Sequence, residues 1–215
     1  MHHCNNPFGI CRLIMAKCDT YRTIKQRSEG VFRDRGSKFL AFAFPVFTRN
    51  EIKKTLDELR KEYHDARHHC YAYRLGAAKE IFRANDDGEP SGSAGNPILG
   101  QIRSKDLSNV LIVVVRYFGG TLLGVGGLIN AYRTAAANAI QDATIISATE
   151  QDLIEINFPY VMMNKIMKII RDEGIKIQEQ DFTETCKIKA SIRKSQTEQV
   201  LGILSIVEGT GASRI

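Results

Sequence analysis

The sequence has no long hydrophobic run. Its longest uninterrupted apolar stretch, Val110–Val115, has the length of a strand, whereas a helix that spans a bilayer needs about 20 such residues. Near the N-terminus, Phe8–Met15 is interrupted by Gly9 and Arg12 and so lacks the pattern of a secretory signal peptide. We therefore expect no contact with a membrane.

Cysteine pairs are lacking as well. The five cysteines are an odd number, lie far apart and include no C-x-x-C pair, which argues against a disulfide framework or a zinc knuckle and is typical of a reducing compartment. We therefore predict a cytoplasmic protein. Cys4, Cys11 and Cys18 lie in a stretch without the pattern of a folded element, and Met15 would serve as an ordinary start. Residues 1–14 are therefore predicted to be a non-native or upstream extension.

The common phosphate-binding fingerprints are also absent. A G-x-G-x-x-G motif that begins at Gly124 fails at Ile129, and a Walker loop that begins at Gly119 has Val125 where lysine is required. No G-x-S-x-G nucleophile elbow occurs. These absences argue against nucleotide hydrolases, dinucleotide-dependent enzymes and serine hydrolases, so we predict no catalytic residue and no cofactor.

The composition is that of a folded globular protein with a moderate excess of positive charge. Hydrophobic residues make up 43% of the 215 residues and charged residues 25%, which argues against extensive disorder. The net charge of +6 permits binding to nucleic acid without requiring it. Basic residues cluster over 22–38 and 187–194, where solvated faces of strands and helices explain them equally well.

The first half of the chain alternates between strand and helix patterns. Residues 30–47 predict a hairpin, and Thr48 with Glu51 forms a capping box that starts a helix. His69–Leu75 and Lys79–Ala84 are typical of paired strands.

A polar segment then precedes a buried strand and a helix. Residues 85–97 are too rich in turn formers for regular structure before Ile98. Val110–Val115 indicates a central strand that is buried on both faces. The helix predicted over Leu128–Asp142 carries four alanines on one face, which permits a close approach to a sheet.

The pattern resets near residues 147–150. The elements predicted beyond it are a strand over Gln151–Phe158, a helix over Tyr160–Glu173, strands over Ile175–Asp181 and Thr185–Ile192 around a turn at 182–184, and a last helix capped by Ser195. The order β-α-β-β-α indicates a ferredoxin-like unit. We therefore predict an α+β protein with a lead-in over 1–27 that is partly non-native or disordered, an α/β domain over 28–146 and a ferredoxin-like domain over 147–215.

The main candidate site is the glycine-rich stretch after the central strand. Five glycines lie within nine positions: Gly119, Gly120, Gly124, Gly126 and Gly127. Glycine allows close backbone approach, and N–H groups at the start of a helix attract anions. One interpretation is therefore an anion or RNA-phosphate site with Arg116 as its charge partner. The other is a tight loop whose glycines only let it pack against neighbouring backbone.

Two further polar clusters could belong to the same site. Asp86, Asp87 and Glu89 gather three carboxylates on one turn, which suits turn formation, a metal or acid–base site, or partner recognition, although the EF-hand pattern fails. His68 and His69 are adjacent on a predicted strand and point to opposite faces, so we predict no metal site. Arg67 and His68 are expected to line a groove beside the glycine loop.

The glycine-rich stretch also carries a family resemblance. The sequence RYFGGTLLGVGGL at 116–128, followed by Ala131 and Tyr132, resembles the signature of the IMPACT/YigZ family of translation-linked proteins. GSKF at 36–39, ARH at 66–68 and DGEPSGSAG at 87–95 resemble its other blocks in the same order. The matches span residues 28–145, and the C-terminal part resembles the bacterial branch.

This resemblance implies a fold and a class of partner. The expected N-terminal domain has the βαβ-type fold of several ribosomal proteins and of elongation factor G, and the C-terminal domain is similar to a late domain of that factor. The implied role is binding to nucleic acid or the translation machinery. The residues that the resemblance and the clusters place in a binding groove are Ser37, Lys38, Arg67, His68, Asp87, Glu89, Ser91, Ser93, Arg116, Gly119, Gly120, Gly124, Gly126 and Gly127.

Three hypotheses follow. The first is a non-enzymatic binding module for RNA or components of the translation machinery, with a regulatory role in translation. The second is a hydrolase or transferase that acts on a phosphorylated substrate in a cleft beside the glycine loop. The third is an adaptor that binds a protein partner in the same groove. The sequence leaves the oligomeric state open.

Overall fold

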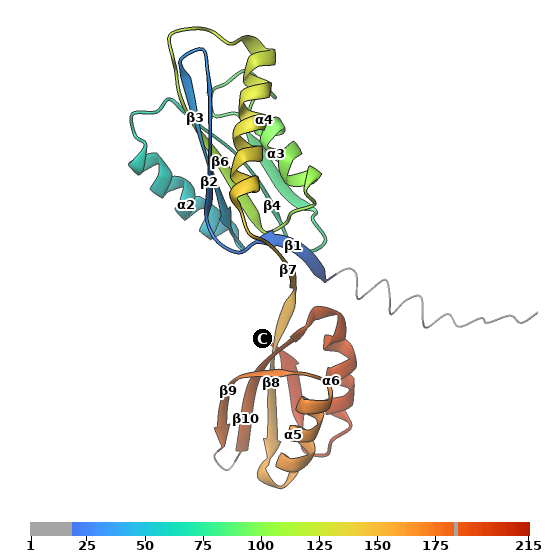
Figure 1. Cartoon of the computed structure of the whole chain (residues 1–215). Coiled ribbons are helices and arrows are strands. Elements are labelled where there is room, and N and C mark those ends of the chain that lie inside the picture. The colour runs from blue at the N-terminus through green and yellow to red at the C-terminus, as the bar shows by residue number, and fades with distance from the viewer. Residues whose placement is uncertain (1–18, 183–184) are drawn as a thin grey trace, which may run out of the picture. The chain divides into compact units, whose positions relative to one another are not determined.

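The computed structural model describes residues 19–182 and 185–215, which form two compact units. The first unit is Tyr21–Ala148, and the second contains Thr149–Ile215 together with Asp19 and Thr20. The predicted extension over residues 1–14 and the three N-terminal cysteines lie outside the described residues. Each unit contains a sheet flanked by helices (Figure 1), and each has its own hydrophobic core. Within the described ranges, no helix combines the length and apolarity that a bilayer crossing requires.

The first unit alternates strands and helices. Its elements in chain order are β1 (Thr20–Ile24), β2 (Ser28–Asp34), β3 (Ser37–Pro45), α2 (Arg49–Glu62), β4 (His68–Leu75), β5 (Ile81–Asn85), α3 (Gly95–Ser104), β6 (Val110–Tyr117), α4 (Gly124–Asp142) and β7 (Ile145–Thr149). β1 pairs with β7, and the other five strands form one sheet in the order β2-β3-β6-β4-β5. The predicted hairpin and the pairing of β4 with β5 are confirmed.

β6 is the central strand of this sheet. It runs antiparallel to β3 on one side and to β4 on the other, and Val110–Val115 is fully buried. α3 and α4 cover one face of the sheet and α2 covers the other, so each face packs a separate apolar cluster (Figure 1). The unbroken apolar run predicted this burial correctly, because a polar side chain on either face of β6 would lie in a core.

α2 begins where its capping box predicts. The backbone N–H of Glu51 donates to the Thr48 hydroxyl at 3.1 Å, and the Glu51 carboxylate accepts from the N–H of Phe47 at 2.8 Å. Both groups of the box therefore satisfy backbone donors at the start of the helix.

α4 packs closely against β2 through small residues, as its alanine face predicts. Ser28 donates its hydroxyl to the carbonyl of Ala139 at 2.8 Å. Gly30 on the same strand has no room for a side chain, because a Cβ there would overlap the backbone nitrogen of Ala139 and lie 2.8 Å from the carbonyl oxygen of Ala135. The helix and the edge strand thus approach to backbone contact.

Two helices of this unit begin earlier than the sequence indicates. α3 already starts at Gly95, inside the segment whose composition predicts no regular structure until Ile98. α4 starts at Gly124, four residues before the predicted start at Leu128, so the last three glycines of the loop belong to its first turn. Glycine is a poor helix former, and the pattern of apolar residues does not reveal these first turns.

The second unit has the predicted ferredoxin-like topology with one additional strand. Its elements are β8 (Gln151–Pro159), η1 (Tyr160–Met162), α5 (Met163–Asp172), β9 (Lys176–Phe182), β10 (Thr185–Arg193), η2 (Lys194–Gln196), α6 (Thr197–Ser205) and β11 (Gly211–Arg214). They form a sheet in the order β11-β8-β10-β9, with α5 and α6 contributing to its core. β11, which the sequence pattern missed, pairs with β8 and completes the sheet.

Ser195 is not the N-cap of α6. The helix starts at Thr197 after a short 3-10 turn, and Gln196 occupies the cap position without a side-chain hydrogen bond. The Ser195 hydroxyl instead donates to the carboxylate of Asp19 at 2.6 Å. An ionised carboxylate is a strong acceptor, and this one lies far from Ser195 in sequence.

The contact between Gly30 and α4 predicts a steric effect on stability. Gly30→Ala should lower the free energy of unfolding by about 1–3 kcal/mol, because the added methyl group forces α4 away from β2. Gly100→Ala is the matched control, since this helical position faces open space and alanine should be neutral or stabilising by up to about 1 kcal/mol. Urea denaturation followed by tyrosine fluorescence is a suitable measurement, because six of the seven tyrosines lie in the first unit. Equal midpoints for the two variants would contradict the close approach.

Candidate functional site

An open groove of about 440 Å³ lies beside the glycine-rich loop of the first unit. The loop and the start of α4 form one wall, with Leu122, Leu123, Gly124, Val125 and Leu128. The opposite side contains Arg67, His68, Glu89, Pro90, Arg116 and Phe118. The structure therefore brings together three of the predicted clusters: the glycine loop, the acidic turn and the start of β4.

The floor of the groove is a buried ion pair. The guanidinium of Arg116 donates to Glu89 Oε1 at 2.6 Å, and the two side chains are only 7% and 4% exposed. Tyr132 on α4 donates its hydroxyl to the same carboxylate oxygen at 2.7 Å. Arg116 also lies over the rings of Phe39 and Phe118, with its guanidinium carbon 5.5 and 5.7 Å from their centroids. Its charge is thus largely compensated within the protein, although its Nε has no hydrogen-bond partner among the residues that the structure describes.

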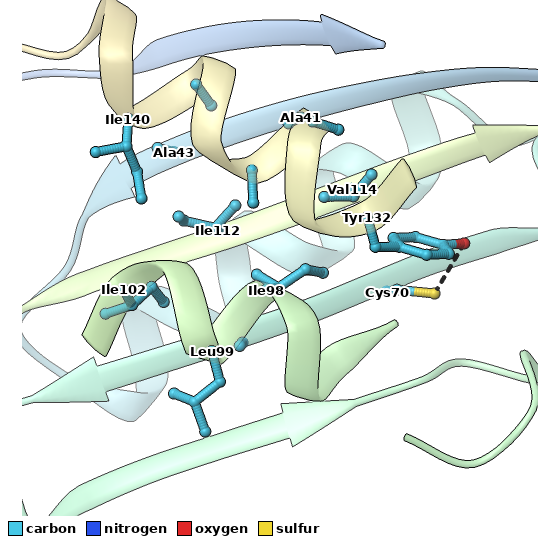
Figure 2. Packing of buried hydrophobic residues seen from close by; sticks show 14 of the residues in the cluster. Ala41, Ala43, Cys70, Ile98, Leu99, Ile102, Ile112, Val114, Tyr132 and Ile140 are labelled. Atoms are coloured by element: carbon cyan, nitrogen blue, oxygen red, sulfur yellow. Dashed lines mark hydrogen bonds between the residues drawn. The ribbon is translucent and has the colours of Figure 1, made fainter. Parts of the chain in front are cut away.

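Hydrogen bonds link the ion pair, through Tyr132, to the thiol of Cys70 in the hydrophobic core. Figure 2 shows the Tyr132 hydroxyl beside the Cys70 sulfur, which donates to it across 3.3 Å and lies 2.9 Å from the carbonyl oxygen of Asp86. Burial raises the pKa of both Cys70 and Tyr132, and the neighbouring Glu89 carboxylate adds to each shift. Both groups therefore stay protonated at neutral pH, so neither is activated as a nucleophile.

Asp86 organises the acidic turn and caps α3. One carboxylate oxygen accepts from the N–H groups of Ala94 and Gly95 at 3.0 and 2.8 Å, and the other accepts from Gly92 at 2.8 Å. Burial raises the pKa of Asp86, but the hydrogen bonds from Gly92, Gly95 and Ala94 outweigh it and hold the pKa below the ordinary 3.8. The turn interpretation of this segment thus accounts for Asp86.

Asp87 ties the same turn to β4. Its Oδ2 accepts from the backbone N–H of His69 at 2.7 Å, its carbonyl oxygen lies 2.8 Å from His68 Nδ1, and its Oδ1 lies 3.5 Å from the Arg60 guanidinium. The carboxylates of Asp86, Asp87 and Glu89 therefore have separate partners and do not converge on one point. Among residues 19–182 and 185–215, no group of three or more histidines, cysteines and acidic residues could hold a metal ion.

The two histidines of β4 have different environments. His68 lines the groove, whereas His69 is buried on the other side of the strand, as the alternation of side chains predicts. Burial lowers the pKa of His69, despite the opposing effect of Asp87. His69 is therefore a neutral core residue.

Gly119 has a packing role. A Cβ at this position would overlap the backbone of Gly36 and Ser37, and the N–H of Gly119 donates to the buried Ser37 hydroxyl at 3.2 Å. Ser37 thus supports the loop from the β2–β3 turn. For this glycine the packing interpretation applies.

The remaining glycines are more open. Gly120 and Gly124 have φ angles of +86° and +72°, and at both, as at Gly126, a side-chain carbon would meet no other atom within 4 Å. A side-chain carbon added at Gly127 would lie 2.9 Å from the Cβ of Leu123, the N-cap residue of α4. Leu123 provides no side-chain hydrogen bond to the start of the helix, which lies beside the groove.

Of the fourteen predicted site residues, five line the groove, namely Arg67, His68, Glu89, Arg116 and Gly124. The nine others include Ser93, Ser91 and Lys38. Ser93 is fully buried and donates its hydroxyl to the carbonyl of Pro90 at 2.6 Å, which stabilises the turn. Ser91 is exposed on that turn. Lys38 belongs to a separate shallow depression at the tip of the β2–β3 hairpin.

Sequence reasoning missed the apolar part of the groove. Phe118, Leu122 and Val125 are 52%, 81% and 53% exposed, although they are large hydrophobic residues. Phe118 directly precedes the glycines of the loop, Leu122 and Val125 stand between them, and the three residues fit neither the period of a strand nor that of a helix. This departure from periodicity is the signal that could have identified them as surface residues.

The comparisons with known proteins concern both units. Residues 35–140 match the family model described as the Impact N-terminal domain. The IMPACT family member YvyE of Bacillus subtilis is 30% identical over 178 residues, which cover 83% of this chain and 82% of that protein. Human Protein IMPACT is 38% identical over 96 residues, or 42% of this chain and 29% of that protein. A crystal structure of a protein described as hypothetical has 25% identity and a TM-score of 0.68, covering 92% of this chain and 98% of that chain.

The buried ion pair predicts that two Glu→Gln substitutions have very different effects on the free energy of unfolding. Glu89→Gln should lower the free energy of unfolding by about 3–5 kcal/mol, because it leaves the Arg116 charge buried without a counter-ion. Glu29→Gln removes the same charge from an ion pair with Arg27, in which the Arg27 and Glu29 side chains are 43% and 60% exposed. This substitution should change the free energy of unfolding by less than about 1 kcal/mol. Urea denaturation measures both, and a similar small effect for the two variants would show that Arg116 does not depend on Glu89.

The lowered pKa of Asp86 predicts a dependence on pH. A carboxyl group with a lower pKa in the folded state adds stability above its unfolded pKa, and this contribution is lost as the pH falls through the folded pKa. Asp86→Asn should therefore destabilise the protein at pH 7, and the difference from the unmodified chain should shrink as the pH falls below about 4. Thermal unfolding from pH 7 to about pH 2 measures this, with Asp172→Asn at an exposed position of α5 as control. A difference that is constant with pH would exclude the assigned hydrogen bonds as the cause.

Proposed function

The chain belongs to the IMPACT family, and we propose that it is a non-enzymatic module that binds single-stranded RNA and has a regulatory role in translation. The observation that carries this proposal is the groove of about 440 Å³ that combines basic residues, the N-terminus of α4 and exposed apolar side chains. The translational role follows from the family resemblance, and the groove supports the choice of ligand.

The electrostatics of the groove favour a phosphate backbone. Arg67 is exposed and forms no ion pair within the part of the chain that the structure describes. His68 bonds through Nδ1 to Asp87, so its other ring nitrogen is left for a ligand. The start of α4 adds the positive end of a helix dipole. Arg116 lies beneath these groups, where its pairing with Glu89 fixes the floor.

The apolar groups favour unpaired bases. Phe118 stands at the edge of the groove and Leu122 and Val125 stand on its wall, all more than half exposed. Proteins that bind single strands stack bases on aromatic side chains next to a positively charged path, whereas a duplex hides its base faces. A groove with one aromatic ring, Arg67 and the start of α4 is therefore better suited to a short single-stranded segment.

The exposed Leu122 and Phe118 also suit a protein partner, so the adaptor hypothesis remains the second candidate. Catalysis has less support in this groove. The thiol of Cys70 and the phenol of Tyr132 are buried beneath it and held in the protonated form. The carboxylates of Asp86, Asp87 and Glu89 are engaged by hydrogen bonds within the protein.

The basic strand of the second unit contributes less than its sequence suggests. Lys187 pairs with Glu155 at 2.9 Å, and Lys189 pairs with Glu179 at 2.7 Å. Their charges are thus compensated on the sheet. We therefore place the RNA contact on the first unit alone.

RNA binding by the groove should be electrostatic and should depend on stacking. Binding of a labelled 12-nucleotide single strand, measured by fluorescence anisotropy, should weaken with added salt, with a slope of log K against log salt of about −0.7 for each phosphate contacted. Phe118→Ala should weaken binding by about 5- to 150-fold if one base stacks on the ring. Arg67→Glu should weaken binding and reduce the salt slope by about 0.7.

The matched control is Lys168→Glu on α5, which changes the net charge equally at an exposed position of the second unit. It should leave the affinity nearly unchanged. Absence of binding at low salt, or equal losses for Arg67→Glu and Lys168→Glu, would refute the RNA proposal. If Phe118→Ala and Arg67→Glu instead abolish co-sedimentation with RNase-treated translation factors, the groove is a protein-binding site.

A further inference from the structure

A second hollow of the first unit, of about 340 Å³, lies between α2 and the β4–β5 hairpin. It is on the face of the sheet that α2 covers, whereas the glycine loop leads into α4 on the other face (Figure 1). It shares no lining residue with the groove. The hollow is therefore a separate feature of the surface.

Four cationic side chains surround this hollow. Arg49, Lys53 and Arg60 come from α2, at spacings of four and seven residues that place them along one side of the helix. Arg83 comes from the edge strand β5, where it is paired in register with Tyr73 of β4. Two separate elements thus direct positive charge to the same place.

Most of this charge is uncompensated. In the described ranges 19–182 and 185–215, Arg49, Lys53 and Arg83 form no ion pair, and the Arg60 guanidinium lies 3.5 Å from Asp87. Asp57 is the acidic residue that lines the hollow. The cations of a solvated helix face usually alternate with acidic partners, as Lys54 does with Glu58 on this helix. Here they gather without such partners.

Two tyrosines with buried rings supply a further polar contribution. Tyr71 and Tyr73 line the hollow and are only 7% and 8% exposed. Neither hydroxyl has a hydrogen-bond partner within the described part of the chain, and neither is among its fully buried unpaired polar atoms. Tyrosine hydroxyls beside a core ordinarily find a partner, so these two are available to donate to a ligand in the hollow.

We propose that this hollow binds a phosphomonoester group. A dianionic phosphate matches an excess of positive charge, and its oxygens accept both from arginine guanidinium groups and from hydroxyl donors. The volume lies at the lower end of the range for small-molecule sites, about 300–1,000 Å³, so a single phosphorylated nucleotide fits better than a folded partner. The group could come from a free mononucleotide or from the 5′-phosphate of an RNA strand, which present the same chemistry.

Calorimetric titration of the full chain at low salt tests the proposal with AMP, adenosine, and a hexanucleotide with or without a 5′-phosphate. AMP should bind and adenosine should not, because the phosphate provides the contact. Arg83→Gln should weaken AMP binding by about tenfold or more, the loss expected for a hydrogen bond to a charged group. Tyr73→Phe, which removes only the hydroxyl, should weaken it several-fold.

Lys54→Gln is the matched control, since this lysine is 78% exposed on the same helix and outside the hollow. It should leave AMP affinity unchanged. If the 5′-phosphate raises the affinity for the hexanucleotide, and Arg83→Gln abolishes that increase, the source of the phosphate is an RNA end. If AMP binds but the 5′-phosphate does not raise the affinity for the hexanucleotide, the source is the free nucleotide. Equal binding of AMP and adenosine, no binding of AMP, or equal losses for Lys54→Gln and Arg83→Gln would overturn the proposal. Because Arg83 and Tyr73 lie outside the groove, a loss of binding caused by Arg83→Gln or Tyr73→Phe reports on the hollow, whether or not the groove binds RNA.

Discussion

The buried carboxylate of Glu89 holds together the parts of the chain that form the groove. It accepts from Arg116 at the end of the central strand and from Tyr132 on α4, and it belongs to the acidic turn. A buried charge is tolerated only with close partners, so these three segments must meet wherever Glu89 is buried. The wall, floor and rim of the groove are therefore positioned by one set of contacts.

The same contacts explain why the acidic turn has a structural role. Each of its carboxylates accepts from donors within the fold: Asp86 from the start of α3, Asp87 from β4 and Glu89 from Arg116. The negative charge of the turn is thus used internally. The groove can present Arg67 and the start of α4 to an anion without strong repulsion from its own acidic rim.

Features with local causes could be predicted from the sequence. The apolar run of β6, the capping box of Thr48 and Glu51 and the alanine face of α4 each depend on neighbouring residues, and the structure confirms all three. The family resemblance likewise rests on contiguous motifs, and the match over residues 35–140 confirms it.

Features that depend on distant residues could not be predicted in this way. The partner of Arg116 lies 27 positions away in sequence, and the hydroxyl of Ser195 bonds to Asp19, 176 positions away, instead of capping its helix. Asp86 caps α3 from outside the usual cap position, so the helix starts without a local signal. The hollow beside α2 requires β5 to lie next to the helix, which no pattern in either segment indicates.

The placement of the two cysteines within the described residues has a practical consequence. Cys70 lies in a core of the first unit and Cys186 in the core of the second, and both are fully buried. A thiol in such a position reacts with alkylating reagents only when its surroundings open. Each unit thus contains its own chemical reporter of local unfolding, and the opening rates of the two units could be followed independently in one intact chain.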